Sequence, residues 1–199
     1  RFNNGDINYF IYDDASNSIS FSYPANTEWQ HVVQVIDNGT MIGYYNGSQV
    51  GQIDISNPMN DSGFEVTFGA TADNNQNLDG KVDDVRLYDR VLNPSEVQQL
   101  YQWGTRGQDL RERTTTKNKN DILGWWKLNE TNGTTAYDSS GNGNNGDITG
   151  AGTGTVSDPI GGSAYDFDGK DDYVELPDVL TTHDELTACL WFKSPSLPS

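Results

Sequence analysis

Apolar and polar residues alternate over short stretches of the chain, which is the pattern of β-strands rather than of long helices. Phe64–Phe68 carries apolar residues at every second position, as half-buried strands do. Val82–Tyr88 alternates as well, with Val85 and Leu87 on one face and Asp83 in line with them. Val32–Ile36 and Met41–Tyr45 are denser apolar runs, and Asp37-Asn-Gly-Thr40 joins them as a tight hairpin turn. We therefore expect antiparallel strands joined by short turns in the first half of the chain.

The same pattern returns in the second half. Ile122–Leu128 and Leu186–Phe192 are apolar runs, and Ala164–Asp168 and Tyr173–Leu176 flank the turn Gly169–Asp172. Short strands at this spacing predict an all-β fold, a two-sheet antiparallel jelly-roll sandwich. We expect its core to contain Trp29, Val33, Tyr45, Phe68, Val85, Leu87, Trp126, Phe167, Val174, Leu190 and Phe192.

One segment carries the signals of a helix. Asn93-Pro-Ser-Glu96 provides Asn at the N-cap, Pro at the first helical position and Glu at the third, which is the chemistry of a helix start. Val97, Leu100 and Tyr101 follow at i, i+3, i+4 spacing, and Gly104 comes soon afterwards. We therefore expect one short helix.

Residues 104–120 differ in composition from the segments on either side. They hold five of the 12 Lys and Arg residues and one large apolar side chain. In an acidic protein, such a segment is better explained as a solvated connector than as a nucleic-acid-binding patch. The chain thus divides into residues 1–103, a linker at 104–120 and residues 121–199.

Composition excludes several classes of protein. The 5 Trp, 10 Tyr and 7 Phe argue for a packed core and against disorder, although only 34% of the residues are hydrophobic. A net charge of −17 makes nucleic acid and anionic membrane surfaces unsuitable partners. No apolar run approaches the roughly 18 residues of a membrane span.

The single cysteine, Cys189, excludes a disulfide within the chain. Because the chain begins with Arg1 and shows no signal peptide, we expect a mature or excised piece.

Blocks of sequence on both sides of the linker carry a family likeness. Late blocks lie at Trp125–Asn129, Ala136–Gly146, Tyr165–Pro177 and Leu186–Lys193. Early blocks lie at Glu28–Val33, Tyr44–Gly47 and Gly80–Val97. The late blocks resemble the first half of a laminin-G-like domain, of the concanavalin A-like jelly rolls, and the early blocks resemble its second half. The two halves of the domain therefore occur in permuted order.

The permuted order has two explanations. The chain is one period of a tandem array or polymer, in which residues 1–103 and 121–199 complete neighbouring domains, or it is a circular permutant that folds alone. A half-sandwich would expose sheet edges and a bare apolar face, which soluble proteins avoid. Each half must therefore find its complement, in cis or in trans. A linker at 104–120 reaches at most roughly 55 to 60 Å, which permits folding back in cis.

The best candidate site is the loop Asp138–Gly146, which contains only Asp, Asn, Ser and Gly. Calcium takes six to eight oxygen ligands from carboxylates, amides and carbonyls. The resemblance implies a structural Ca²⁺ here, closed by a carboxylate from Val82–Tyr88. The expected ligands are Asp138, Gly141, Asn142, Asn145 and Asp83. Asp83 is preferred to Asp84 because it alternates in line with Val85 and Leu87, and an inward carboxylate needs a partner or a metal. The alternative is a metal-free, Asx-rich turn.

Other chemistry has weaker support. Gly169–Asp172 offers carboxylates for a second ion, although it resembles the family's ordinary hairpin turn. The paired carboxylates of a glycosidase, in a Glu-x-Asp-x-x-Glu strand motif, are absent from the sequence. His31 matches a family position that is usually packed, and no nucleophile motif accompanies His183. We therefore do not expect an enzyme.

Five sequons, at Asn38, Asn46, Asn60, Asn129 and Asn132, are candidate glycan acceptors in a secreted protein. Taken together, the sequence favours an extracellular, calcium-stabilised structural or adhesive repeat. Such a repeat would assemble into a fibre or surface array by β-sheet complementation with copies of itself. The alternative is a monomeric extracellular module that binds cell-surface glycans or proteins at the loop rim or on the concave sheet. The sequence names no ligand-binding residue.

Overall fold

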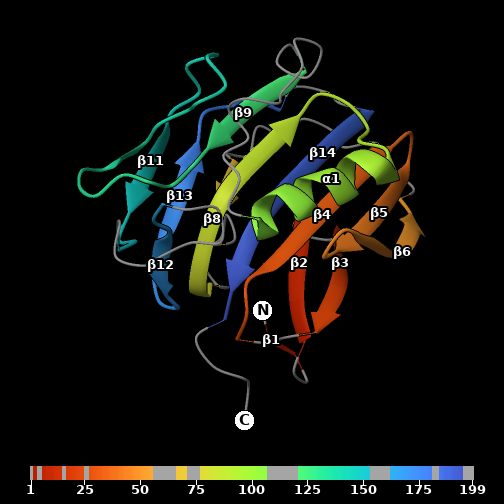
Figure 1. Ribbon diagram of the computed structural model, residues 1–199, viewed down its shortest axis with the longest axis horizontal. Helices are drawn as coiled ribbons and strands as arrows, with labels where there is room; N and C mark the ends of the chain where they lie inside the picture. Colours follow the sequence, from red (N-terminus) through yellow and green to blue (C-terminus); the bar gives the residue numbers. More distant parts are fainter. Residues whose placement is uncertain are drawn as a thin grey trace.

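The computed structural model of the chain (Figure 1) describes residues 2–3, 6–14, 17–24, 27–55, 66–70, 77–106, 121–152, 162–180 and 184–194. Most of the expected linker, the first residues of the strand expected at Phe64–Phe68, the sequon residue Asn60 and His183 lie outside this set.

Two antiparallel sheets build the sandwich, as the sequence predicts. The larger sheet has the order β12 (Tyr165–Asp168), β8 (Asp79–Tyr88), β14 (Glu185–Lys193), β4 (Gln30–Asp37), β5 (Thr40–Tyr45) and β6 (Ser48–Asp54), with β9 (Ile122–Trp126) also paired to β8. The smaller sheet has the order β10 (Thr135–Ala136), β11 (Gly146–Thr149), β13 (Tyr173–Leu176) and β7 (Val66–Phe68). A separate sheet joins β1 (Phe2–Asn3), β2 (Asp6–Asp14) and β3 (Asn17–Pro24).

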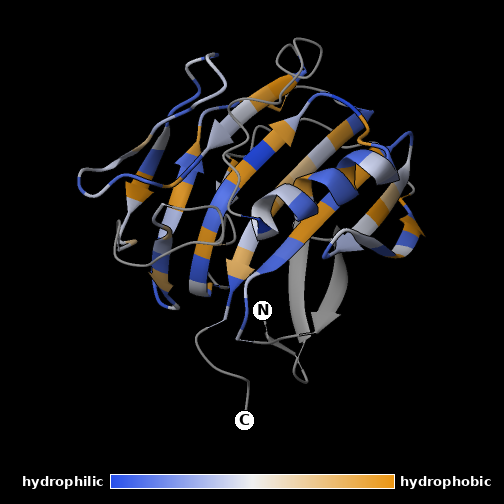
Figure 2. Cartoon of the chain, viewed as in Figure 1, coloured by the Kyte–Doolittle hydropathy of each residue, from blue (hydrophilic) through white to orange (hydrophobic). Residues whose placement is uncertain are grey.

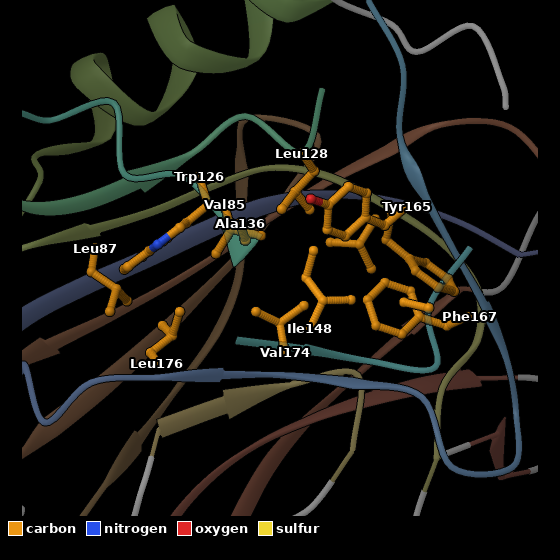
Figure 3. Close-up of a cluster of buried hydrophobic side chains, with 13 residues drawn as sticks. Val85, Leu87, Trp126, Leu128, Ala136, Ile148, Tyr165, Phe167, Val174 and Leu176 are labelled. Carbon is orange, nitrogen blue, oxygen red and sulfur yellow. The ribbon is translucent and has the colours of Figure 1, made fainter. Parts of the chain in front are cut away.

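Side chains from the two sheets meet in one buried cluster (Figure 3). Leu87 and Trp126 come from the larger sheet, and Ile148, Val174 and Leu176 come from the smaller one. Apolar and polar residues alternate along the strands (Figure 2), so that one face of each strand is available for this contact. The predicted core residues divide into buried Val33, Val85, Leu87, Trp126, Phe167, Val174 and Phe192 and half-buried Trp29, Tyr45, Phe68 and Leu190.

Helix α1 (Pro94–Thr105) begins where the sequence predicts and is held by a capping box. The Asn93 side chain accepts hydrogen bonds from the backbone N–H groups of Ser95 and Glu96, at 3.0 and 3.1 Å. The Glu96 carboxylate accepts in return from the Asn93 N–H at 2.9 Å. These bonds satisfy donors that a helix start leaves without partners.

The helix covers the outer face of the larger sheet, where it lies over β14 and β4 (Figure 1). Val97 and Leu100 of α1 belong to a second buried cluster with residues of β4, β5, β8, β9 and β14. Gly104 allows close contact near the end of the helix, because a Cβ atom there would lie 2.2 Å from the Trp191 ring. The middle of this face is therefore closed to a ligand.

The two halves of the chain interleave within the larger sheet. Strand β8, from residues 1–103, pairs with β12 and β14, which both come from residues 121–199. Strand β14 in turn lies between β8 and β4. In the smaller sheet, β7 from the first half pairs with β13 from the second. In this structure the halves complete each other within one chain.

A β-bulge in β8 corrects the position expected for Asp83. Cys189 of β14 pairs with Arg86 and Trp191 pairs with Asp83, so β8 has one extra residue between these partners. Asp84 occupies the bulge with a φ of 52°. The extra residue shifts the alternation. Asp83 therefore shares a face with its partner Trp191, on the α1 side. The expectation that it is in line with Val85 and Leu87 is wrong.

Candidate functional site

The carboxylate of Asp138 is the centre of the loop Asp138–Gly146. Its Oδ1 atom accepts hydrogen bonds from the backbone N–H groups of Trp125, at 3.0 Å, and Ser140, at 2.8 Å. Its Oδ2 atom accepts from the Ser140 hydroxyl at 2.7 Å and from the Asn144 N–H at 3.0 Å. Burial raises the pKa of Asp138, but these hydrogen bonds outweigh it, and the net pKa lies below the ordinary value.

Two amides of the loop bind the backbone of β9. The Asn142 side chain donates to the carbonyls of Ile122, at 2.7 Å, and Leu123, at 3.2 Å. The Asn144 side chain donates to the Leu123 carbonyl at 2.7 Å. The Ser139 N–H donates to the Trp125 carbonyl at 2.7 Å. The loop therefore lies along the edge of β9 that faces away from β8.

The predicted calcium ligands can be tested against this geometry. A carboxylate has about four acceptor positions, and on Asp138 donors take all four. The Asn145 Oδ1 atom accepts from the Asp138 N–H at 2.9 Å. Asp83 lies on β8, so β9 stands between it and the loop, with roughly 10 Å for two strand spacings. Asp138, Asn142 and Asn145 are brought together with exposed Gly141, but Asp83 is not, and the set does not fit Ca²⁺.

A buried ion pair lies on the other side of β9. Arg86 Nη2 lies 2.7 Å from Asp84 Oδ2, and the Trp125 Nε1–H donates to Asp84 Oδ1 at 2.5 Å. Burial lowers the pKa of Arg86, but the neighbouring Asp84 offsets this, and the net pKa is raised. The Arg86 guanidinium lies 4.5 Å from the Trp125 ring centroid and the Lys127 ammonium 4.2 Å. With cations against its ring, Trp125 is a poor stacking platform for a sugar.

His31 is packed, as the resemblance implies. It is 2% exposed, and its ring centroid lies 5.0 Å from that of Trp191 and 6.2 Å from that of Tyr101. Burial, with a smaller contribution from Arg86, lowers its pKa to about 3. A neutral imidazole enclosed by aromatic rings has no access to a substrate, so His31 is unsuited to act as a catalytic base.

The turn between β12 and β13 gathers carboxylates that can hold a cation. One carboxylate oxygen from each of Asp168, Asp171 and Asp172 lies within 4.8 Å of the others. Asp172 is buried and accepts from the Asp168 N–H at 2.7 Å, while Lys170 lies 2.6 Å from Asp168. Asp79 is directly opposite Asp168 on β8, an arrangement of like charges that costs stability. The Lys-Asp-Asp run was the sequence signal for this position.

The predicted glycan acceptors differ in accessibility. Asn38, Asn129 and Asn132 are exposed, whereas Asn46 is half-buried. The Asn46 Oδ1 atom accepts from the His31 N–H at 2.9 Å, which leaves its amide nitrogen as the group for attachment. Three of the described sequons are thus open to modification. In the described part of the chain, no helix is long and apolar enough to cross a membrane.

Comparison with known families agrees with this architecture. Residues 1–98 match a family model, Laminin_G_3, described as the concanavalin A-like lectin/glucanases superfamily. No curated protein and no solved structure matches the chain. The matched segment contains strands β1 to β8 and ends within α1. Its strands β4 to β8 form an antiparallel sandwich with strands of the second half. Residues 1–98 of this chain are therefore similar to the concanavalin A-like lectin/glucanases superfamily, in keeping with the antiparallel sandwich.

Proposed function

We propose that the chain is an extracellular structural or adhesive repeat, in which each laminin-G-like domain is assembled from the halves of two neighbouring copies. Similarity to the superfamily favours a binding module of a generally non-catalytic type, and laminin-G-like domains are typically extracellular. The observation that carries the proposal is the interleaving of β8 and β14. Neither half has neighbours for its central strand without the other.

The ends of the described chain support a head-to-tail arrangement. Phe192, near the end of β14, pairs with Gln30, the first residue of β4. A chain that joined the end of one copy to the start of the next would therefore restore the family order with no change in strand pairing. The linker would then run between domains instead of folding back. The sheet contacts are the same in either arrangement, and only the identity of the donating chain differs.

Burial makes the complementation strong. Trp126 and Phe192 from the second half share a buried cluster with Val85 and Leu87 from the first. Each fully buried side chain of this size contributes roughly 1.5 to 3 kcal/mol. Separated halves would lose these contacts together with the hydrogen bonds of the central strands. For a half that lacks its partner in the same chain, association with the matching half of another copy is therefore strongly favourable.

Complementation between two defective variants tests the proposal. Val85→Asp damages the first half and Trp126→Asp damages the second, and each variant alone should refold poorly. Refolded together, they can combine one intact first half with one intact second half, so native tryptophan fluorescence and a 44 kDa species should return (two chains of 22.0 kDa). As a control, Val85→Asp refolded alone should recover neither the fluorescence nor the 44 kDa species. If the wild-type chain stays at 22 kDa and the mixture of variants does not recover, assembly between copies is contradicted and the chain is a self-contained permutant.

A second candidate function is a monomeric module that binds glycans or proteins. It is favoured by the cover that α1 provides on the larger sheet, because this directs a ligand toward the loop rim. Tyr137, beside the Asp138 loop, is 60% exposed. Glycan-array binding by a monodisperse 22 kDa protein, reduced by Tyr137→Ala, would support this function over the assembled repeat.

Calcium is the cation that we propose for stabilisation of the domain, since members of the superfamily often bind it. The carboxylates of Asp168, Asp171 and Asp172 supply suitable hard oxygen ligands. A calcium-dependent rise in melting temperature that is lost in Asp171→Asn would support this position. A melting curve that EDTA and calcium leave unchanged would contradict it.

A further inference from the structure

We infer that the loop Asp138–Gly146 is a metal-independent cap for the free edge of β9, in which the Asp138 carboxylate is the organising centre instead of Ca²⁺. The loop contacts β9 at the backbone carbonyls of Ile122, Leu123 and Trp125 and at the Trp125 N–H. An edge strand ordinarily leaves such groups open to water or to another chain.

Four hydrogen bonds on the Asp138 carboxylate make it a poor ligand for calcium. The N–H groups of Trp125, Ser140 and Asn144 and the Ser140 hydroxyl direct their positive ends at the two oxygens. A cation bound there would face the same hydrogens and displace some of them. Calcium also needs six to eight oxygens.

Other oxygens of the loop are engaged as well. The Asn144 carbonyl accepts from the Trp126 Nε1–H at 2.8 Å. The Asn145 side-chain oxygen accepts from the Asp138 N–H. The glycines Gly141 and Gly143 have φ values of 98° and 82°, so they provide the backbone turns that bring these groups to β9. The composition that suggests a calcium loop is thus accounted for by strand capping.

The cap also fixes the position of Trp125. Asp138 holds the Trp125 N–H, while the indole N–H of the same residue donates to Asp84. Asp138 therefore acts as a positioning residue for the contact between Trp125 and the buried Asp84–Arg86 pair. Loss of the cap should be visible in the tryptophan fluorescence of the folded protein.

Melting curves of the full chain in EDTA and in calcium test the inference. Asp138→Asn replaces one acceptor oxygen by a donor, so it should lower the melting temperature by roughly 5 to 10 °C. The decrease should be the same in EDTA and in calcium. Asp147→Asn is the matched control, because it removes an exposed carboxylate from β11 and should change the melting temperature little.

Calcium titration by calorimetry covers the case in which Asp138→Asn does not fold. Ser140→Ala removes one of the four hydrogen bonds to the Asp138 carboxylate, the one from the hydroxyl, and keeps the one from the backbone N–H. It should lower stability without changing calcium affinity. No binding by the wild-type chain, or binding that Ser140→Ala and Asp138→Asn retain, supports the metal-independent cap. Calcium binding by the wild-type chain that Asp138→Asn or Ser140→Ala weakens at least tenfold, with Asp147→Asn unaffected, would overturn it.

Discussion

At the scale of single residues, the half-buried carboxylate of Asp138 and the buried carboxylate of Asp84 are each held by specific partners. Asp138 has four donors, and Asp84 is bound by both Arg86 and Trp125. The sequence predicts that Asp138 is important but not why, because Asp, Asn and Gly serve strand capping as well as calcium ligation. Which of the two applies depends on β9, which a local motif does not reveal.

The low pKa of Asp138 predicts a specific acid sensitivity. In the unfolded chain an aspartate titrates near about 3.9. Since the folded pKa is lower, the unfolded state binds the proton more readily, and acid favours unfolding. The contribution of Asp138 is complete above the unfolded pKa and is lost as the pH falls through the folded pKa. Urea unfolding from pH 6 to pH 2 should show a steeper loss of stability for wild type than for Asp138→Asn. Parallel curves would contradict this assignment.

The buried pair Asp84–Arg86 predicts a large effect when one partner is removed. Asp84→Ala leaves the Arg86 guanidinium buried without its counter-charge, which should cost about 3 to 5 kcal/mol of unfolding free energy. The double variant Asp84→Ala with Arg86→Met removes both charges and should cost much less than the single changes Asp84→Ala and Arg86→Met added together. Chemical denaturation of the four proteins measures this coupling. Additive effects would show that the two charges act independently.

At the scale of elements, local chemistry predicts much of the structure. The capping box at Asn93–Glu96 and the hairpin at Asp37–Thr40 are read directly from neighbouring residues and occur as expected. The bulge at Asp84 is not predictable in this way, because it is defined by the pairing of β8 with β14, about a hundred residues away. It moves Asp83 to the other face of the sheet.

The contact between α1 and β14 predicts an unusual response to a helix-favouring substitution. Alanine is about 1 kcal/mol better than glycine inside a helix. At Gly104, however, the added Cβ would lie 2.2 Å from the Trp191 ring. Overpacking of this kind typically costs about 1 to 3 kcal/mol, so Gly104→Ala should destabilise the protein. Gln99→Ala, at an exposed position of the same helix, is the control and should be neutral or slightly stabilising in thermal unfolding.

At the scale of the whole molecule, strands from both halves of the chain share one sandwich. The family likeness of residues 121–199 and 1–103 predicts that they form one sandwich, and the strand pairing of the chain follows that arrangement. Which copy provides each half cannot be deduced from hydrophobic patterning, because the same apolar surfaces are buried in both cases. It depends on two concentrations. One is the concentration of neighbouring chains, and the other is the effective concentration that the linker gives the two halves of one chain.

Because β12, β8, β14 and β4 interleave, the oligomeric state formed during refolding should be kinetically trapped. Exchange of a half requires a central strand to lose both neighbours, so a monomer and an exchanged oligomer interconvert only through extensive unfolding, which is slow in native conditions. Chains refolded at about 1 µM should be mostly monomeric and those refolded at about 100 µM mostly oligomeric. Brought to one concentration, the two samples should keep different sedimentation profiles for days. Rapid convergence to a common profile would show that the association is a reversible surface contact.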